Sequence, residues 1–250
     1  MSDLSGRTAL VTGGGTGLGA DLARGLAAAG AEVWIAGRTE ARLEEVAESM
    51  ERIRPVVADV TDEVSVATLF DRVGAPEIVI ANAGASESAP LARTGLGAWE
   101  RMLAVNLTGV FLTFREAVRR LGKAPDWGRL IAVASTAGLK GYPYVTAYTA
   151  AKHGVVGLVR AAALETARSG VTVNALCPGF LDTEMTGRSV VNIVEKTGMS
   201  ADAARASLEA MSPQRRLIRP AEVTAAALWL CGPGSEGITG QAIAIAGGEA

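Results

Sequence analysis

Short runs of β-branched and other apolar residues alternate with longer stretches of helical pattern along almost the whole chain. The strand-like runs are Thr8–Thr12, Glu32–Ala36, Ile53–Ala58, Glu77–Asn82, Gly128–Ala134, Val171–Leu176 and Gln241–Ala246. The helical stretches are Leu18–Ala29, Glu40–Arg52, Glu63–Val73, Leu96–Leu121, Ala147–Ser169 and Ala221–Leu230. Strands joined by connections of helix length form right-handed βαβ units and pair in parallel. We therefore predict an α/β protein with a doubly wound, mostly parallel sheet of seven strands, covered by helices on both faces.

The chain is expected to form one domain over residues 1–250. Its 250 residues, 49% of them hydrophobic, suffice for one large core, and no linker or charge block interrupts the alternation. Residues 182–213 are polar and irregular, and they follow the carboxyl end of a strand-like run. A substrate lid is expected at such a place.

Composition excludes several classes of partner. The net charge is −2 and the basic residues are scattered, so attraction to nucleic acid or to an anionic membrane is not expected. The first residues lack the apolar core of a signal peptide, and no apolar stretch reaches the roughly 20 residues of a membrane span. Cys177 and Cys231 lie in apolar surroundings, which favours buried reduced thiols, and with one histidine no metal site is expected. We predict a cytoplasmic protein.

A glycine-rich stretch, TGGGTGLG, follows the first strand-like run and opens the first helical stretch. Gly13, Gly17 and Gly19 are spaced for a tight turn, for close approach of a diphosphate and for close helix packing. Free N–H groups and the helix dipole attract an anion there, and the hydroxyls of Thr12 and Thr16 can add contacts. The pattern favours a dinucleotide-binding Rossmann fold over a plain glycine-rich turn.

The end of the second strand-like run indicates which dinucleotide binds. An NAD site presents an acidic side chain there, roughly 20 residues after the glycines, but this chain has Gly37 and Arg38. Arg38 can pair with the 2′-phosphate of NADP, and Gly37 leaves room for it; the alternative is a solvated arginine at a helix start. Asp59 is suited to a hydrogen bond with the adenine amino group. NADP(H) is therefore favoured over NAD(H).

Tyr148 and Lys152 stand four residues apart in a helical stretch, so both side chains lie on one helix face. A free tyrosine has a pKa near 10, and a neighbouring cation lowers that pKa toward the range useful for proton exchange with an alcohol. Ser135, at the end of the fifth strand-like run, can bind the carbonyl or alcohol oxygen beside the phenol. Together with the glycine-rich turn, these residues indicate acid–base chemistry.

The chain resembles the short-chain dehydrogenase/reductase family in its compact, single-domain form, over essentially all 250 residues. The segments that carry the resemblance are the TGGGTGLG turn, Asp59-Val60, Ala81-Asn82-Ala83-Gly84, Asn106 in Val-Asn-Leu-Thr-Gly, Ser135, Tyr148, Lys152, Val173-Asn174-Ala175 and Cys177-Pro178-Gly179. Ala81 departs from the pattern, because the family often has a second asparagine there. The resemblance implies an oxidoreductase that interconverts a ketone and a secondary alcohol by hydride transfer.

The resemblance further implies a catalytic tetrad of Asn106, Ser135, Tyr148 and Lys152. Tyr148 is then the general acid and base, and Ser135 polarises the substrate oxygen. Lys152 binds the nicotinamide ribose and lowers the tyrosine pKa, while Asn106 holds a water for proton relay. The residues expected to contact the cofactor are Gly13, Thr16, Gly17, Leu18, Gly19, Arg38, Asp59, Val60, Asn82, Ala83, Gly84, Tyr148, Lys152, Pro178, Gly179 and Thr183.

The loops after the fourth, fifth and sixth strand-like runs are expected to form an apolar substrate pocket with few charges. The residues expected to contact the substrate are Ser135, Leu139, Tyr142, Tyr144, Phe180 and Met185. The segments around Ser135 and Lys152 are similar to those of ketoreductases that act on 3-oxoacyl thioesters and aromatic polyketides.

A 3-oxoacyl or 3-hydroxyacyl thioester, or a polyketide-like compound, is the expected substrate. Arg188, Lys196, Arg215 and Arg219 can meet the phosphates of a CoA or carrier-protein arm, although acidic neighbours nearly balance them. Two alternatives stay open: a dehydrogenase of alicyclic, aromatic or steroid alcohols, and a nucleotide-binding partner or regulator without catalytic activity. The resemblance also implies a homotetramer.

Overall fold

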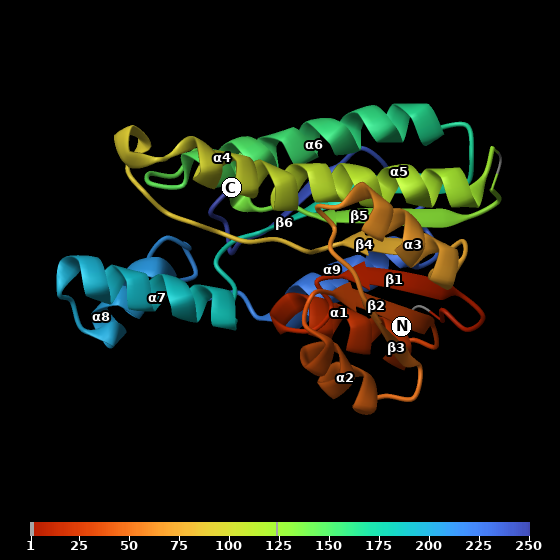
Figure 1. Ribbon diagram of the computed structural model, residues 1–250, viewed down its shortest axis with the longest axis horizontal. Helices are drawn as coiled ribbons and strands as arrows, with labels where there is room; N and C mark the ends of the chain where they lie inside the picture. The colour runs from red at the N-terminus through yellow and green to blue at the C-terminus, as the bar shows by residue number, and fades with distance from the viewer. Residues whose placement is uncertain (1–2, 124) are drawn as a thin grey trace.

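The structure, a computed structural model, describes residues 3–123 and 125–250 and contains a seven-stranded sheet between two layers of helices (Figure 1). The strands are β1 (Thr8–Thr12), β2 (Glu32–Gly37), β3 (Ile53–Val57), β4 (Ile78–Ala81), β5 (Gly128–Val133), β6 (Val171–Pro178) and β7 (Ala242–Ile245). They pair in the order β3-β2-β1-β4-β5-β6-β7, and every pairing is parallel. The predicted doubly wound α/β fold is confirmed.

Two sets of helices bury the two faces of the sheet (Figure 1). The helices on one face are α1 (Gly17–Ala28), α2 (Glu40–Glu48) and α9 (Pro220–Cys231); those on the other are α3 (Glu63–Val73), α5 (Gly109–Leu121) and α6 (Thr146–Thr166). Side chains alternate between these layers, so that Val11 of β1 packs with α1 and α9, and Leu10 packs with α3 and α5. Because both faces are covered, β5 and β6 are buried along their whole length.

A π-helical segment interrupts the helix predicted over Leu96–Leu121. Helix α4 (Leu96–Leu103) is followed by Ala104–Thr108 in π conformation before α5 begins. Asn106, which is fully buried, donates its Nδ2 to the carbonyl of Met102 one turn earlier, at 3.0 Å. A side chain that takes a helix carbonyl displaces the regular backbone hydrogen bond, which accounts for the π segment. The helical stretch predicted over Leu96–Leu121 is therefore confirmed, with a π segment inside it that the sequence pattern did not indicate.

Residues 182–213, predicted to be irregular, contain two helices that extend beyond the sheet (Figure 1). These are α7 (Glu184–Thr197) and α8 (Ala201–Glu209). Gly198 ends α7 in the left-handed conformation, and the hydroxyl of Ser200 caps α8 by accepting the N–H of Ala203. These helices were missed because the segment is polar on average and few of its side chains are buried, although each helix has an apolar side.

Cys177 and Cys231 are both buried and free, as their apolar surroundings predicted. None of the helices in the described ranges is long and apolar enough to cross a membrane. Among the same residues, no group of three or more metal-binding side chains comes together.

The strand order reverses between β1 and β4, which stand side by side at the centre of the sheet. In a doubly wound sheet the ligand crevice lies at the carboxyl ends of the strands at such a reversal. The glycine-rich turn follows β1, the loop with Asn82 follows β4, and Ser135 and Gly179 follow β5 and β6. The topology thus gathers all four predicted segments at one edge.

A substitution at Gly19 tests how closely α1 must pack against the glycine-rich turn. A Cβ on Gly19 would lie 2.1 Å from the carbonyl oxygen of Gly13, so we predict that Gly19→Ala costs at least about 2 kcal/mol or prevents folding. Gly187, in exposed α7, has nothing within 4 Å of such a Cβ, and Gly187→Ala should be neutral or stabilise by about 0.5–1 kcal/mol. Thermal unfolding without cofactor compares the two; equal midpoints would contradict the packing argument.

Candidate active site

The glycine-rich turn lies so close to the loop after β4 that side chains would not fit between them. Gly13 has a φ of 65°, and a Cβ there would lie 2.8 Å from the Cα of Ala83. Gly17 also has a positive φ, 51°. A Cβ on Gly14 would come within 2.7 Å of Ile35, a requirement that the sequence interpretation missed. This close packing fits the expected role of the turn.

Thr12 and Asn82 hold the two loops together. The hydroxyl oxygen of Thr12 accepts the N–H groups of Asn82 and Ala83, both at 3.1 Å. Asn82 donates its Nδ2 to the carbonyls of Thr12 at 3.0 Å and Gly13 at 3.2 Å. Thr12 is 1% exposed, so it braces the turn, and the diphosphate contact considered for its hydroxyl does not fit this position.

Helix α1 begins at the open end of the turn without a side-chain cap. Thr16 is the N-cap residue, with a φ of −155°, but its hydroxyl makes no capping hydrogen bond, and no acidic residue lies in the first turn. Leu18 is buried behind it. Free N–H groups at the positive end of a helix dipole bind anions. Together with the space that the glycines leave, they fit the diphosphate of a dinucleotide.

Arg38 and Asp59 follow β2 and β3 at the same edge. Arg38 is exposed and forms no ion pair with any residue that the structure describes. Asp59 accepts the N–H and the hydroxyl of Thr61 on Oδ1, at 2.9 and 2.7 Å. These bonds, with a smaller contribution from Arg38, hold the pKa of Asp59 below its ordinary value. Val60 is buried and packs against Gly109, where a Cβ would lie 2.8 Å from it.

Ser135, Tyr148 and Lys152 converge at the carboxyl end of β5. Ser135 accepts the N–H of Ala137 at 3.1 Å, and its hydroxyl is also hydrogen-bonded to Tyr148. Lys152 is 3% exposed. Its Nζ lies 5.5 Å from the centre of the Tyr148 ring and donates to the carbonyl of Val133 at 2.8 Å. The phenol and the ammonium thus share one face of α6, as their spacing predicted.

Burial dominates the proton affinities of these groups. It raises the pKa of Tyr148, which the hydrogen bond with Ser135 lowers to a smaller extent. It lowers the pKa of Lys152 to about 8. Desolvation is the largest influence on the phenol here and the ammonium of Lys152 is directed to Val133, so the lowering of the tyrosine pKa by Lys152 stays a prediction. At neutral pH Tyr148 is therefore protonated, the form that donates a proton.

Asn106 clamps the loop after β4 beside Lys152. Its Oδ1 accepts the N–H of Ala85 at 3.2 Å, and its Nδ2 donates to the carbonyl of Ala85 at 2.9 Å. A Cβ on Gly84 would lie 2.9 Å from Oδ1 of Asn106 and 3.8 Å from Nζ of Lys152. The amide is thus engaged with the backbone. In this structure it positions the loop, whereas the resemblance implied a ligand for water.

The segment after β6 extends from the glycine-rich turn to the loop after β4. Pro178 ends the strand, and the N–H of Gly179 donates to Ile245 at 3.1 Å. Thr183, just before α7, lies 3.5 Å from where a Cβ on Gly17 would be. Farther along α7, Asn192 donates to the hydroxyl of Ser88 at 2.9 Å.

An ion pair adds a contact at the start of α7. Arg42 of α2 pairs with Glu184 at 2.9 Å, and a Cβ on Gly15 would lie 3.3 Å from Arg42. Helix α7 therefore touches both ends of the crevice, a placement that fits a lid.

The expected substrate residues differ in their orientation. Tyr142 and Phe180 pack edge to face, with ring centres 6.4 Å apart. Leu139 packs against the core beneath α6 and Met185 is half-buried. Tyr144 is 63% exposed with a φ of 69°, and its carbonyl accepts the N–H of Ala89 at 2.8 Å. Tyr144 therefore joins two loops and offers its ring to solvent.

One charged residue beside this wall was missed. The carboxylate of Glu249 is 3% exposed and accepts the hydroxyl of Tyr142. The pocket predicted to have few charges thus has a buried carboxylate next to it. Glu249 follows two glycines near the end of the sequence and belongs to no motif, so the sequence carries no signal for it.

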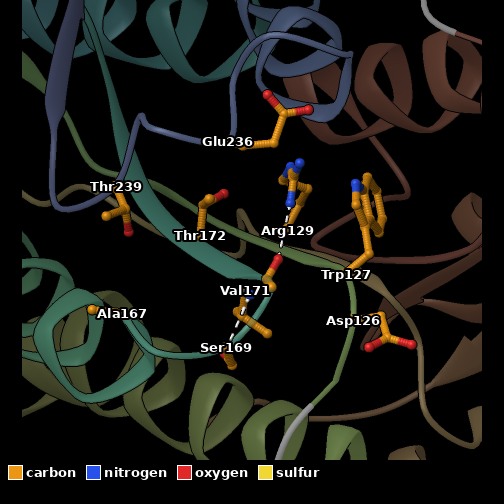
Figure 2. Close-up of a pocket in the computed structure, with 10 residues that line it drawn as sticks. Asp126, Trp127, Arg129, Ala167, Ser169, Val171, Thr172, Glu236 and Thr239 are labelled. Carbon is orange, nitrogen blue, oxygen red and sulfur yellow. Dashed lines mark hydrogen bonds between the residues drawn. The ribbon is translucent and has the colours of Figure 1, made fainter.

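A cavity of about 150 Å³ lies apart from these residues, at the amino ends of β5 and β6 (Figure 2). Arg129, which is 1% exposed, donates there to the carbonyls of Leu230, Gly128 and Gly170 at 2.9–3.2 Å. It ties the two strands to the end of α9. The residues lining the cavity are Asp126, Trp127, Arg129, Ala167, Ser169, Gly170, Val171, Thr172, Glu236 and Thr239. None of them is a predicted site residue.

The lowered pKa of Lys152 predicts a pH dependence of stability. Below about pH 8 both folded and unfolded chains carry the proton, and the fold bears the full cost of a buried charge. Between about 8 and the ordinary value of 10.5, only the unfolded chain keeps it, so the free energy of unfolding rises with pH. Relative to Lys152→Met, the wild-type protein should gain on the order of 3 kcal/mol over this range. Urea unfolding at several pH values measures it; parallel curves would refute it.

Comparisons with known proteins agree with this geometry. The family model described as short chain dehydrogenase matches residues 7–192. A cis-4-hydroxycyclohexanecarboxylate dehydrogenase of Sinomonas cyclohexanicum is 38% identical, over 97% of this chain and 96% of its own. A 3-oxoacyl-(acyl-carrier-protein) reductase of Aquifex aeolicus is 32% identical over 98% of each chain.

A solved structure extends the likeness to three dimensions. The crystal structure of a variant of actinorhodin polyketide ketoreductase with NADPH has a TM-score of 0.91 and 31% identity, over 100% of this chain and 99% of that one. With its parallel sheet and its Tyr148–Lys152 pair beside a glycine-rich turn, the chain belongs to the short-chain dehydrogenase/reductase family of oxidoreductases.

Proposed function

We propose that this protein is an NADP(H)-dependent enzyme that interconverts a ketone and a secondary alcohol. The observation that carries the proposal is the convergence of Ser135, Tyr148 and Lys152 beside a turn that fits a diphosphate. Bound NADP(H) supplies the hydride chemistry. The protonated phenol of Tyr148 gives its proton to the substrate oxygen in the reductive direction, and the Ser135 hydroxyl polarises the same oxygen. Lys152 keeps a positive charge beside the phenolate that forms.

The choice of NADP rests on charge at the end of β2. Arg38 is exposed and without an ion pair in the described part of the chain, so its guanidinium is available to a 2′-phosphate. The solved ketoreductase named with NADPH supports the same choice.

For the substrate we propose a 3-oxoacyl or 3-hydroxyacyl thioester or a polyketide-like compound. The likeness to a 3-oxoacyl-(acyl-carrier-protein) reductase and to a polyketide ketoreductase supports it. Arg215 is exposed and forms no ion pair within residues 3–123 and 125–250, so it is free to meet a phosphate of a CoA or carrier-protein arm. Arg219 is less suited, because it lies 3.5 Å from Glu222.

Two other functions stay as alternatives. A dehydrogenase of alicyclic, aromatic or steroid alcohols is supported by the relative named for cis-4-hydroxycyclohexanecarboxylate. A nucleotide-binding partner or regulator without activity is the less favoured alternative, because all four tetrad positions are present.

We further propose that α7 and α8 act as a lid, that the protein is cytoplasmic and that it assembles as a homotetramer. The contacts of α7 at both ends of the crevice support the lid. The buried free cysteines fit a reducing compartment. Exposed apolar side chains on α5, α6 and α9, namely Phe111, Val118, Leu164 and Trp229, fit contacts between copies of the chain.

Replacing Tyr148 tests the chemistry. We predict that Tyr148→Phe lowers kcat about 10²–10⁴-fold on every ketone that the wild-type enzyme reduces, because it removes the proton donor. NADPH binding, followed by nicotinamide fluorescence, should persist. His153 follows Lys152 in α6, is exposed and, among the residues that the structure describes, is hydrogen-bonded only to Thr149 of the same helix. His153→Gln is therefore the control with intact turnover. Turnover that survives Tyr148→Phe would favour the binding alternative.

Replacing Arg38 tests the cofactor. We predict that Arg38→Leu lowers kcat/KM for NADPH about 10–100-fold and leaves that for NADH within a fewfold, because only the 2′-phosphate contact is lost. The control is Arg52→Leu, which removes the same charge just before β3, at the amino ends of the strands, where Arg52 pairs with Glu32 at 2.7 Å. Absorbance assays over a panel of ketones give both ratios, and equal losses for the two coenzymes would overturn the assignment.

A further inference from the structure

A charged network beside the substrate end of the crevice has no part in the proposed proton transfer. Oε1 of Glu249 accepts the hydroxyl of Tyr142 and lies 3.4 Å from Nζ of Lys140. The same ammonium donates to the main-chain oxygen of Glu249 at 2.9 Å and lies 5.2 Å from the centre of the Tyr142 ring. The three side chains thus hold one another in place, and they fix a carboxylate that is almost completely buried.

The phenol of Tyr142 donates its hydrogen bond to this carboxylate and takes no part in the proposed proton transfer. Its hydroxyl also lies 2.7 Å from that of Thr136. Because a phenol has one proton, it donates to Glu249 and accepts from Thr136. Burial, and next to it the hydrogen bond with Glu249, raise the pKa of Tyr142. Tyr142 therefore stays neutral and keeps the carboxylate in one orientation.

The network adjoins the reacting groups. Thr136 directly follows Ser135 in the chain, and Phe180 packs edge to face on Tyr142. A Cβ on Gly179 would lie 3.1 Å from Oε2 of Glu249. The second carboxylate oxygen thus lies against the backbone at the end of β6, between the expected nicotinamide seat and the substrate wall. It makes no hydrogen bond within the part of the chain that the structure describes.

The cation of the network offsets the carboxylate's charge only in part. Lys140 lies 3.4 Å from Oε1 of Glu249, and 40% of its side chain is exposed to water, which weakens the pair. The remaining side chains expected on the wall, those of Leu139, Phe180 and Met185, are neutral. A ligand carboxylate placed here would meet a like charge, and the other cation of the site, Lys152, is directed to the carbonyl of Val133. Such repulsion is stronger in a partly buried site than in water.

We propose that Glu249 determines substrate specificity: its carboxylate excludes carbonyl compounds that carry their own carboxylate near the reacting carbon and favours neutral ones. The inference rests on the proposed function and selects among the substrate classes named there. Esters, thioesters and cyclic ketones are accepted, whereas free oxo acids are rejected. It therefore favours the thioester or polyketide-like substrate over a hydroxycarboxylate.

Matched pairs of neutral and anionic ketones test this proposal. Ethyl 3-oxobutanoate is compared with 3-oxobutanoate, and ethyl 4-oxocyclohexanecarboxylate with its free acid. For each compound that the enzyme reduces, kcat/KM is measured. For each compound that it does not reduce, the inhibition constant is measured with one of the reduced ketones as substrate. The wild-type enzyme should prefer each ester, and Glu249→Gln should reduce that preference at least about tenfold, because the amide keeps the shape and removes the charge.

Two further variants separate charge from structure. Glu249→Asp keeps the charge and should keep the preference even if overall activity falls. Glu48→Gln removes the same charge from the exposed end of α2 and should leave the ratio as it is. An ester-to-acid ratio that is the same in wild type and Glu249→Gln would overturn this inference while leaving the proposed function standing. A wild-type enzyme that reduces no ketone with either coenzyme would instead overturn the proposed function.

Discussion

The close approach of the backbones at Gly13 and Ala83 is the constraint on which the rest of the site depends. Thr12 and Asn82 enforce it with four hydrogen bonds that link the end of β1 to the end of β4. The same loop continues to Gly84 and Ala85, which Asn106 holds from the π segment. Asn106 in turn lies beside the ammonium of Lys152, next to where a side chain on Gly84 would point. The turn that fits a diphosphate and the ammonium of Lys152 are therefore parts of one braced unit.

Each brace uses a polar group, buried in Thr12 and Asn106 and half-buried in Asn82, that is hydrogen-bonded mainly to backbone atoms. A buried polar group without a partner costs about 1–3 kcal/mol, so the amides of Asn82 and Asn106 and the hydroxyl of Thr12 are stable only in this arrangement. The loops on either side of the crevice thus have one favourable relative position. A catalytic site gains from this rigidity, since reacting groups must be held close to the productive geometry.

The layout of the fold was predictable because it depends on patterns that repeat along the chain. Alternating apolar runs and helical stretches indicated a parallel sheet, and the spacing of Tyr148 and Lys152 indicated a shared helix face. The π segment was not predictable, because it arises from one side-chain hydrogen bond between Asn106 and Met102. Helices α7 and α8 were missed because their surface is polar and few of their residues are buried. Glu249 was missed because its importance comes from burial, which a single glutamate in a sequence does not reveal.

Burial also acts on the proton affinities of the site. Spacing alone suggested that the ammonium of Lys152 acts on the phenol of Tyr148, and desolvation acts on both groups as well. Desolvation then favours the neutral form of each, which raises one pKa and lowers the other. Tyr142 follows the same rule. At neutral pH the phenol of Tyr148 is thus uncharged, while Lys152, with a pKa of about 8, still carries its proton. A fixed charge next to the substrate, such as that of Glu249, acts in a site that holds few other charges and has a large effect there.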